Sequence, residues 1–275
     1  MTSRALIVTG GLRGLGRAMA LGLAAAGHKA FAVGHLSGDV DLLRKDIANE
    51  PWRDNVETHV ADLRDPAACD GVPRAAVKRF GRIDGLINNA GLTFTYISPG
   101  REFGKPAPRF WEIGDEVVQN VMDTNFGIAN KMSRRIAPFL MQQGWGRIIN
   151  VTTKLETMNR PGTTPYNASK AALEMASEVW AKELAGTGVT VNILNPGAGA
   201  HTQGMSDGLR QASRDGKIER FVEPDEMVPP LLWLVSSHAD AVNGRRYDAN
   251  SWDVSIEPNA AAQKCGIEAG FVLKG

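Results

Sequence analysis

The sequence ALIVTGGLRGLG, residues 5–16, determines how this chain of 275 residues is organised. Residues 5–9 form an apolar run rich in β-branched side chains, which is typical of a strand buried on both faces. Glycines follow with the spacing G-x-x-x-G-x-G, and residues 17–26 predict a helix that ends at Gly27. This order predicts a phosphate-binding turn, because glycine lets the backbone approach a pyrophosphate and a helix N-terminus presents free N–H groups.

The alternation of strand and helix continues along the chain. Further strands are expected at residues 29–33, 56–61, 84–91, 146–153, 189–197 and 245–248. Helices are expected at residues 41–49, 66–80, 116–142, 166–185 and 223–236. Such regular alternation predicts an α/β fold, a single-domain, Rossmann-like, doubly wound parallel sheet with helices on both faces. We expect this catalytic domain to span residues 1–248 and a C-terminal tail to span residues 249–275.

Composition narrows the classes of function. The net charge of +1 argues against nucleic acid or an acidic membrane as the main partner. No apolar run is long enough to span a bilayer, so we expect a cytoplasmic location. Cys69 and Cys265 lie far apart, and no spacing of histidine, cysteine and carboxylate residues predicts a metal site.

The end of the second expected strand bears on the cofactor. In a dinucleotide-binding fold this point meets the adenosine ribose, where an acidic residue would bind the 2′-hydroxyl of NAD. Here the sequence is Gly34-His35-Leu36-Ser37, with no carboxylate before Asp39. Arg13 and His35 could contact a 2′-phosphate, which favours NADP(H). NAD(H) is the alternative if these two side chains point away from the ribose.

Tyr166 and Lys170 lie four residues apart on a predicted helix, so both side chains leave the same helix face. A positive charge beside a phenol favours the phenolate and lowers its pKa from the usual value of about 10. Such a phenol can take a proton from an alcohol or give one to a carbonyl oxygen. The motif Y-x-x-x-K alone is commonly an ordinary helix surface, so the hypothesis depends on its context.

That context resembles the short-chain dehydrogenase/reductase family over roughly residues 5–248. The resemblance rests on motifs in the family's order, namely residues 9–16, Asp62, residues 88–91, Asn125, the Tyr166–Lys170 pair, and residues 195–197 with Thr202. Each motif alone is weak, but together in register they are specific. The family implies a nicotinamide cofactor, a small-molecule alcohol or carbonyl substrate, and a homodimer or homotetramer.

The resemblance also implies roles for individual residues. Tyr166 would be the general acid in reduction, Lys170 would lower its pKa and hold the nicotinamide ribose, and Asn125 would connect Lys170 to solvent through a backbone-bound water. Thr153 stands where the family has a serine that orients the substrate, and Thr152 is the alternative in register. The predicted cofactor-binding residues are Gly10, Arg13, Gly14, Leu15, Gly16, His35, Asp62, Asn89, Ala90, Gly91, Tyr166, Lys170, Pro196, Gly197 and Thr202.

Three segments depart from the family or from regular structure. Residues 92–115 form a long segment rich in aromatic residues and proline, which we expect to line or cover the substrate pocket or, alternatively, to pack at a subunit interface. Residues 198–222 are polar and are expected to be mobile. The tail carries Trp252 and Phe271, which suggest docking on the pocket rim or across a subunit interface.

Other polar residues near the expected site are ambiguous. They could grip a polar substrate or simply be solvated loop residues: Lys154, Glu156, His201 and Met205. The remaining histidines are expected at the surface or at helix ends: His28, His59 and His238. The sequence thus predicts an NADP(H)-dependent carbonyl reductase or alcohol dehydrogenase, with the NAD(H)-dependent enzyme as the alternative. A cofactor-binding sensor or scaffold with little catalysis is the competing class.

Overall fold

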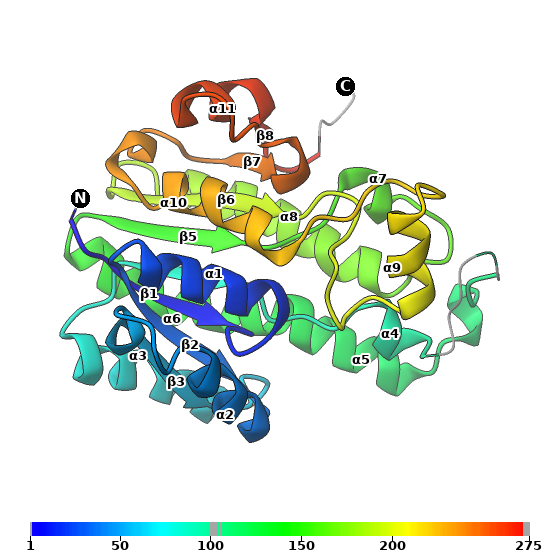
Figure 1. Cartoon of the computed structure of the whole chain (residues 1–275), viewed down its shortest axis with the longest axis horizontal. Helices are drawn as coiled ribbons and strands as arrows, with labels where there is room; N and C mark the ends of the chain where they lie inside the picture. Colours follow the sequence, from blue (N-terminus) through cyan, green and yellow to red (C-terminus); the bar gives the residue numbers. More distant parts are fainter. Residues whose placement is uncertain (1, 100–103, 105, 272–275) are drawn as a thin grey trace.

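The computed structural model describes residues 2–99, 104 and 106–271, with helices on both sides of a central sheet (Figure 1). The sheet has eight strands in the order β3-β2-β1-β4-β5-β6-β7-β8. Strand neighbours from β3 to β7 pair in parallel, and β8 pairs antiparallel with β7. The strands span Ala5–Thr9 (β1), Lys29–Gly34 (β2), Val56–Val60 (β3), Gly85–Asn88 (β4), Gly146–Asn150 (β5), Val189–Asn195 (β6), Arg245–Asp248 (β7) and Ile267–Glu268 (β8). The predicted doubly wound parallel sheet is confirmed.

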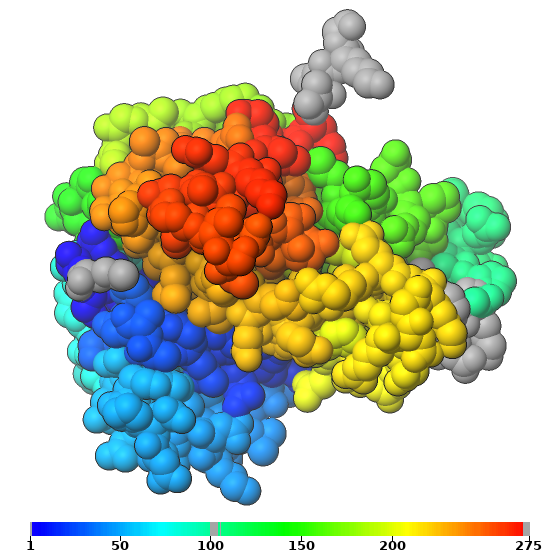
Figure 2. Space-filling model, turned by 45° about the horizontal axis from the view of Figure 1, so that its top comes forward, coloured from blue at the N-terminus to red at the C-terminus, as the bar shows by residue number. Residues whose placement is uncertain are grey.

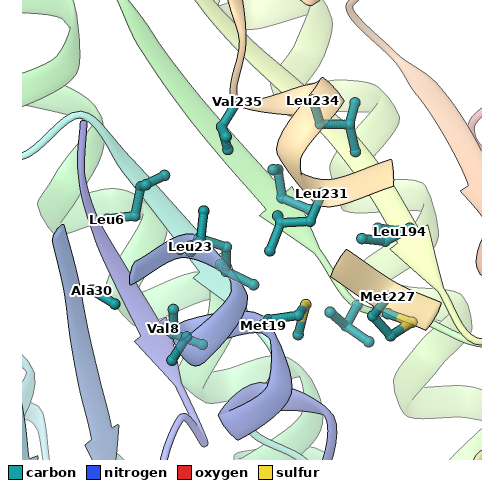
Figure 3. Close-up of a cluster of buried hydrophobic side chains, with 14 of the residues drawn as sticks. Leu6, Val8, Met19, Leu23, Ala30, Leu194, Met227, Leu231, Leu234 and Val235 are labelled. Carbon is teal, nitrogen blue, oxygen red and sulfur yellow. The ribbon is translucent and has the colours of Figure 1, made fainter. Parts of the chain in front are cut away.

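Two hydrophobic clusters form on opposite faces of the sheet because successive strand residues point to opposite sides. Leu6 and Val8 of β1 belong to the cluster under α1 and α10, whereas Ile7 belongs to the cluster under α3 and α6. Figure 3 shows the first cluster, in which Met19 and Leu23 face the sheet and Leu231 approaches from α10. The helices span Gly14–Ala25 (α1), Ser37–Asp46 (α2), Pro66–Phe80 (α3), Phe94–Ile97 (α4), Asp115–Met122 (α5), Ile128–Gln142 (α6), Leu155–Met158 (α7), Tyr166–Glu183 (α8), Asp207–Arg214 (α9), Val228–Leu234 (α10) and Pro258–Cys265 (α11).

The helix expected over residues 116–142 has an interruption in its middle. A π-helical turn, Asp123–Gly127, lies between α5 and α6, and the flanking residues keep right-handed helical dihedral angles. A π turn adds a residue to the helical repeat and is frequent at functional sites. Here it carries Asn125, whose side chain is almost fully buried.

The two irregular segments contain short elements that the sequence did not predict. The segment 92–115 holds α4 and a short 3-10 turn at Phe110–Glu112; its residues 100–103 and 105, which include the aromatic Phe103, lie outside the described residues. The segment 198–222, expected to be mobile, holds α9. A bridge between Ala200 and Val222 closes that segment on itself. Figure 2 shows this yellow segment beside the blue N-terminal part of the chain.

The tail extends the sheet and the core rather than standing apart from them. Trp252 is 9% exposed and packs against Trp233 of α10 and Tyr247 of β7, with ring centroids 5.8 Å and 6.4 Å apart. Helix α11 packs against α10, and β8 covers the outer edge of β7. The expectation that Trp252 docks on a pocket rim or a subunit interface is therefore wrong, because its indole completes the chain's own core. Phe271 ends the described part of the tail and is 37% exposed.

Candidate active site

The predicted site residues meet at the carboxyl edge of the parallel sheet. The ends of β1, β4, β5 and β6 lie side by side there because these strands pair in parallel. In open α/β sheets, ligands bind outside this edge. The segment after β1 supplies the glycine loop, and the first turn of α8 supplies Tyr166.

The glycine loop has the shape of an anion-binding turn. Gly10 and Gly14 have φ angles of 63° and 55°, in the left-handed region that favours glycine. A Cβ at Gly16 would overlap the Gly10 carbonyl, so the helix can start this close to the loop only with glycine there. Arg13 caps α1 without a side-chain hydrogen bond, and the first turn of α1 holds no acidic residue. Its N–H groups are thus free for a phosphate, and the residues fit the pyrophosphate of a dinucleotide. Leu15 is the second residue of this first turn, after Gly14.

The turn after β4 is fastened to the glycine loop. Backbone N–H groups of Asn89 and Ala90 donate to the Thr9 hydroxyl at 3.0 Å and 3.1 Å, and the Asn89 amide donates back to the carbonyls of Thr9 and Gly10. Gly91 lies next to the π turn and to α8. A Cβ there would be 3.3 Å from the Asn125 side-chain oxygen and 3.5 Å from Lys170 Nζ.

Asn125 uses its side chain to join three elements. Its Oδ1 accepts from the Leu92 N–H at 2.7 Å, while its Nδ2 donates to the Leu92 carbonyl and to the Ser169 hydroxyl, at 3.0 Å and 2.9 Å. The side chain is therefore fully used in tying the π turn to the segment after β4 and to α8. Any role in carrying a proton must fall to its backbone.

Helix α8 presents its inner face to the chain just beyond β5. Lys170 Nζ donates to the Val151 carbonyl at 2.8 Å, and the Tyr166 hydroxyl is hydrogen-bonded by the Thr153 hydroxyl. The Thr152 hydroxyl instead donates to Glu174 Oε2 at 2.9 Å. Of the two threonines, Thr153 therefore lies beside the phenol, and Thr152 is turned away from it.

Burial sets the protonation of this pair. Burial raises the pKa of the Tyr166 phenol, and the hydrogen bond from Thr153 opposes that shift. Burial lowers the pKa of the Lys170 ammonium to about 8. Lys170 Nζ lies 5.9 Å from the centroid of the Tyr166 ring and is committed to the Val151 carbonyl. The expected lowering of the phenol pKa by Lys170 is therefore not what governs Tyr166 in this structure.

The turn after β6 is held from β7 and from the tail. Asn195 Oδ1 accepts from the Gly197 N–H at 2.9 Å, and its Nδ2 donates to Asp248 at 2.7 Å. A Cβ at Gly197 would overlap the Asn250 side chain, so the tail packs directly on this turn. Pro196 lies within the turn. Thr202 lies over the glycine loop, 3.6 Å from the position of a Cβ on Gly14.

The residues proposed at the adenosine end have neighbours of their own. Arg13 Nε donates to Gln203 at 3.0 Å and lies 3.8 Å from the Asp39 carboxylate. His35 is exposed and lies near Asp62, whose pKa is lowered to about 2, chiefly by hydrogen bonds from Arg64. Asp62 therefore keeps its charge, and its two carboxylate oxygens accept from Nε and Nη2 of Arg64.

Among the other residues named from the sequence, Phe94 contacts Tyr166, whereas the polar residues and histidines have other surroundings. Phe94 of α4 packs on Tyr166 with ring centroids 4.8 Å apart, so the aromatic segment does reach the phenol. Lys154 is paired with Glu219 at 2.9 Å, and His201 packs on Phe221 with its buried Nδ1 unpartnered. Glu156 is exposed and Met205 partly buried.

The remaining histidines lie away from this site. His28 is buried behind α1, where its Nδ1 accepts from the Arg4 N–H. His59 is partly buried, and His238 is exposed.

Sequence reasoning missed two residues that contact this site. Glu174 and Arg246 are both fully buried and ion-paired at 2.9 Å directly behind Thr152 and Thr153. Glu174 follows Lys170 at the same four-residue interval that links Lys170 to Tyr166, so the helix spacing could have placed it on the inner face. Arg246 lies on another strand, and its partner could not be read from spacing.

The chain matches a family model described as short chain dehydrogenase over residues 4–212. It is 32% identical over 271 residues to fluoren-9-ol dehydrogenase of Terrabacter sp., covering 92% of this chain and 72% of that protein. A solved structure of a putative NAD(P)-dependent gluconate 5-dehydrogenase from Beutenbergia cavernae, with bound NADP, superposes with a TM-score of 0.76 at 29% identity, covering 90% and 96% of the two chains. A 3-ketoacyl-(acyl-carrier-protein) reductase from Brucella melitensis, complexed with NADH, gives 0.74 at 25% identity, covering 89% and 96%.

The chain therefore belongs to the short-chain dehydrogenase/reductase family. It is an NAD(P)-dependent oxidoreductase that acts on CH–OH or C=O groups. Within the described ranges, no helix has both the length and the apolar character needed to cross a membrane. Among the same residues, no group of His, Cys, Asp and Glu is arranged to hold a metal ion.

Proposed function

We propose that the protein is an NADP(H)-dependent carbonyl reductase, acting as an alcohol dehydrogenase in the reverse direction, with Tyr166 as the general acid and base. The observation that carries this proposal is the hydrogen bond from Thr153 to Tyr166 beside the buried Lys170. A phenol with a hydroxyl neighbour and an ammonium neighbour can exchange a proton with an oxygen of the substrate. The glycine loop and the turns after β4 and β6 border the same edge of the sheet.

The bound nicotinamide would supply the hydride, and the chain's own residues would bind, orient and handle the proton. The N-terminus of α1 would hold the pyrophosphate, with Gly10, Gly14 and Gly16 allowing its close approach. In reduction the Tyr166 hydroxyl would give its proton to the carbonyl oxygen, and Thr153 would orient that oxygen through its own hydroxyl. In oxidation the phenolate would take the proton from the alcohol.

Two residues would support the proton transfer. Lys170, with its pKa lowered to about 8 by burial, would stabilise the phenolate and contact the nicotinamide ribose. Asn125 would act through its backbone carbonyl in the π turn, because its side chain is taken up by Leu92 and Ser169. This arrangement would let a proton pass from solvent to Lys170 through a bound water.

The preference for NADP(H) is supported by the charge at the end of β2. Arg13 and His35 flank this point, and neither residue 34 nor residues 35–38 carry a carboxylate. Asp39 lies 3.8 Å from Arg13 and supports the alternative, NAD(H), because a carboxylate there could compete with a phosphate for the guanidinium. Both cofactors occur among the solved relatives.

The substrate class is proposed from Phe94, which lies against the ring of Tyr166. An apolar ring at the reacting phenol favours a ketone or secondary alcohol with an apolar, ring-bearing body. The relative whose name is fluoren-9-ol dehydrogenase supports the same class. A homo-oligomer is proposed from the family resemblance, and a cytoplasmic location from the lack of a bilayer-spanning apolar run in the sequence.

The test is titration of the purified protein with NADPH and NADH, followed by turnover with ring-bearing ketones. We expect tighter binding of NADPH, and we expect Tyr166→Phe to bind the cofactor normally while losing nearly all turnover. Tighter binding of NADH would overturn the cofactor preference. A protein that binds cofactor but shows no turnover, with Tyr166→Phe indistinguishable from the parent, would instead be a sensor or scaffold.

A further inference from the structure

The backbone leaves the sheet just beyond β5, where the proposed catalytic threonine lies, and the Val151 N–H still donates to the Asn88 carbonyl of β4 at 2.9 Å. The pairing of β5 with its neighbours stops at Asn150, and residues 151–153 are irregular. A buried backbone still needs hydrogen-bond partners, and here side chains supply them to two of the carbonyls. Lys170 donates to the carbonyl of residue 151, and Arg246 Nη2 donates to the carbonyl of Thr153 at 3.0 Å.

Arg246 and Glu174 form a buried ion pair that is hydrogen-bonded to both Thr152 and Thr153. Its Nη1 lies 2.9 Å from Glu174 Oε1, and the two side chains are 1% and 0% exposed. Glu174 Oε2 accepts from the Thr152 hydroxyl, while Arg246 holds the Thr153 carbonyl. Arg246 also lies 3.2 Å from Asp248, whose carboxylate accepts from the Asn195 side chain at the end of β6. The pair therefore contacts the Thr153 backbone directly and is linked to the end of β6 through Asp248.

The tail completes this pair. The Gly270 N–H donates to Glu174 Oε1 at 3.2 Å, so the carboxylate has partners from the chain beyond β5, from β7 and from the tail. Gly270 has a φ angle of 86°, and a Cβ there would overlap the Glu178 carboxylate. Only glycine therefore lets the tail approach Glu174 this closely.

We propose that Glu174 and Arg246 are positioning residues that hold the Thr153 hydroxyl against Tyr166, and that the tail acts on the reaction through Gly270. This inference rests on the proposed function. The threonine side chain can point at the phenol only while the backbone of residue 153 is fixed, and the guanidinium is what fixes its carbonyl. Loss of that hold would weaken the hydrogen bond that lowers the pKa of Tyr166.

A second buried arginine provides the control. Arg147 of β5 is also 1% exposed, but its partner Asp240 is 53% exposed, and the pair lies at the start of the strand rather than beyond its end. Its other hydrogen bonds go to the carbonyls of Gly146, Leu234 and Ser236, and its guanidinium lies 4.1 Å from the centroid of the Trp145 ring, all away from the proposed site. Replacing either arginine by lysine keeps the charge but removes the planar fork. Both variants should therefore lose stability, and only Arg246→Lys should change the chemistry.

The experiment compares Arg246→Lys with Arg147→Lys in steady-state kinetics, NADPH titration and thermal unfolding. For Arg246→Lys we expect kcat to fall tenfold or more, with the NADPH dissociation constant within twofold of the parent. In the oxidative direction activity should rise with pH as Tyr166 ionises, and in Arg246→Lys this rise should occur at higher pH than in the parent. Arg147→Lys should keep both the kcat and the pH profile of the parent. Equal kcat in the two variants, or an unchanged pH profile in Arg246→Lys, would overturn the inference.

A double variant tests whether Arg246 acts through Thr153. Thr153→Val removes the hydroxyl, so adding Arg246→Lys to it should lower kcat little further. If the fall in kcat of the double variant equals the product of the two single falls, Arg246 acts independently of the Thr153 hydroxyl, which would contradict the inference. If the parent protein has no turnover at all, the proposed function fails; if the parent turns over and Tyr166→Phe does not, while Arg246→Lys is normal, only the inference fails.

A milder pair of variants covers the case in which Arg246→Lys does not fold. Gly270→Ala should displace the tail from Glu174 and lower kcat several-fold. Gly27→Ala introduces the same backbone strain at a φ angle of 88°, with nothing within 4 Å of the added methyl group. We expect Gly27→Ala to lose only stability. Equal kcat for the two alanine variants would reject the role of the tail.

Discussion

Lys170 Nζ donates to the carbonyl oxygen of Val151 at 2.8 Å, in surroundings that leave the side chain only 4% exposed. A buried ammonium loses hydration that one carbonyl cannot replace, so burial lowers its pKa to about 8. The residue that the proposed mechanism uses to steady a phenolate is therefore itself close to titration at physiological pH.

This shift predicts a titration that can be observed directly. In the cofactor-free protein one lysine should titrate near pH 8, against an ordinary value near 10.5. Because the folded pKa lies below the unfolded one, the unfolded state binds more protons between these values, and stability rises with pH across that window. Lysine-selective NMR of the side-chain carbons would follow it. The resonance that titrates near pH 8 should be absent from the spectrum of Lys170→Met. If it persists in that variant, it belongs to a different lysine.

Thr153 and Thr152 should differ in what their loss affects. Thr153→Val should lower kcat by roughly 100-fold, as removal of a donor to the reacting oxygen commonly does, while Thr153→Ser should retain most activity. Thr152→Val leaves Glu174 one hydrogen bond short, so it should lower stability by about 1–3 kcal/mol. Steady-state kinetics and urea unfolding separate the two. A kcat loss in Thr152→Val larger than in Thr153→Val would reverse the assignment.

Arg13 should affect one cofactor and not the other. If its guanidinium contacts the 2′-phosphate, Arg13→Ala should raise KM for NADPH by roughly 10- to 100-fold, the effect of one or two charge-assisted hydrogen bonds. KM for NADH should stay within about twofold. Gln203→Ala is the control, because it removes the other partner of Arg13 and leaves the charge in place. An equal rise for both cofactors would show that Arg13 orders the loop instead.

Phe94 should affect the substrate more than the chemistry. Phe94→Ala removes the ring that packs on Tyr166, so KM for ring-bearing ketones should rise by about 10-fold while KM for small aliphatic ketones changes little. Phe110→Ala is a matched control, since Phe110 is 68% exposed. An equal rise in KM for both ketone classes would show that Phe94 positions Tyr166 and does not select the substrate.

Trp252 should contribute to stability. Its indole is buried against Trp233 and Tyr247, so Trp252→Ala should lower the free energy of unfolding by about 3–5 kcal/mol. Trp111, 70% exposed, serves as the control, and Trp111→Ala should change stability by less than about 0.5 kcal/mol. Urea unfolding followed by circular dichroism measures both. Similar small losses would mean that the tail is loosely attached.

Local patterns in the sequence were sufficient for most of the fold. The bounds of β1 and α3 were predicted correctly because β-branched runs, Pro66 and Gly81 mark them. Helix α1 begins three residues earlier than predicted, because Gly14 and Gly16 look like loop residues and yet form its first turn. Helix α9 was not predicted, because its sequence is polar on average and its apolar residues, Leu209 and Ala212, are too few to stand out although they share one face.

The arrangement of the site was predicted only where its partners are close in sequence. Tyr166 and Lys170 could be placed on one face from their spacing. The choice between Thr152 and Thr153 depended on side-chain direction after the strand, which spacing does not define. The Glu174–Arg246 pair and the place of Trp252 depend on contacts between distant segments, and these arise only when the whole sheet has formed.

The bond between Gly270 and Glu174 sets an order of events during synthesis. The ribosome makes Glu174 together with the proposed catalytic helix, long before it makes the arginine of β7 and the glycine of the tail. Until those residues are made, the Glu174 carboxylate has only the Thr152 hydroxyl among its three partners. The segment translated last among the described residues thus supplies the last hydrogen bond to Glu174, and a chain terminated before Gly270 would lack it.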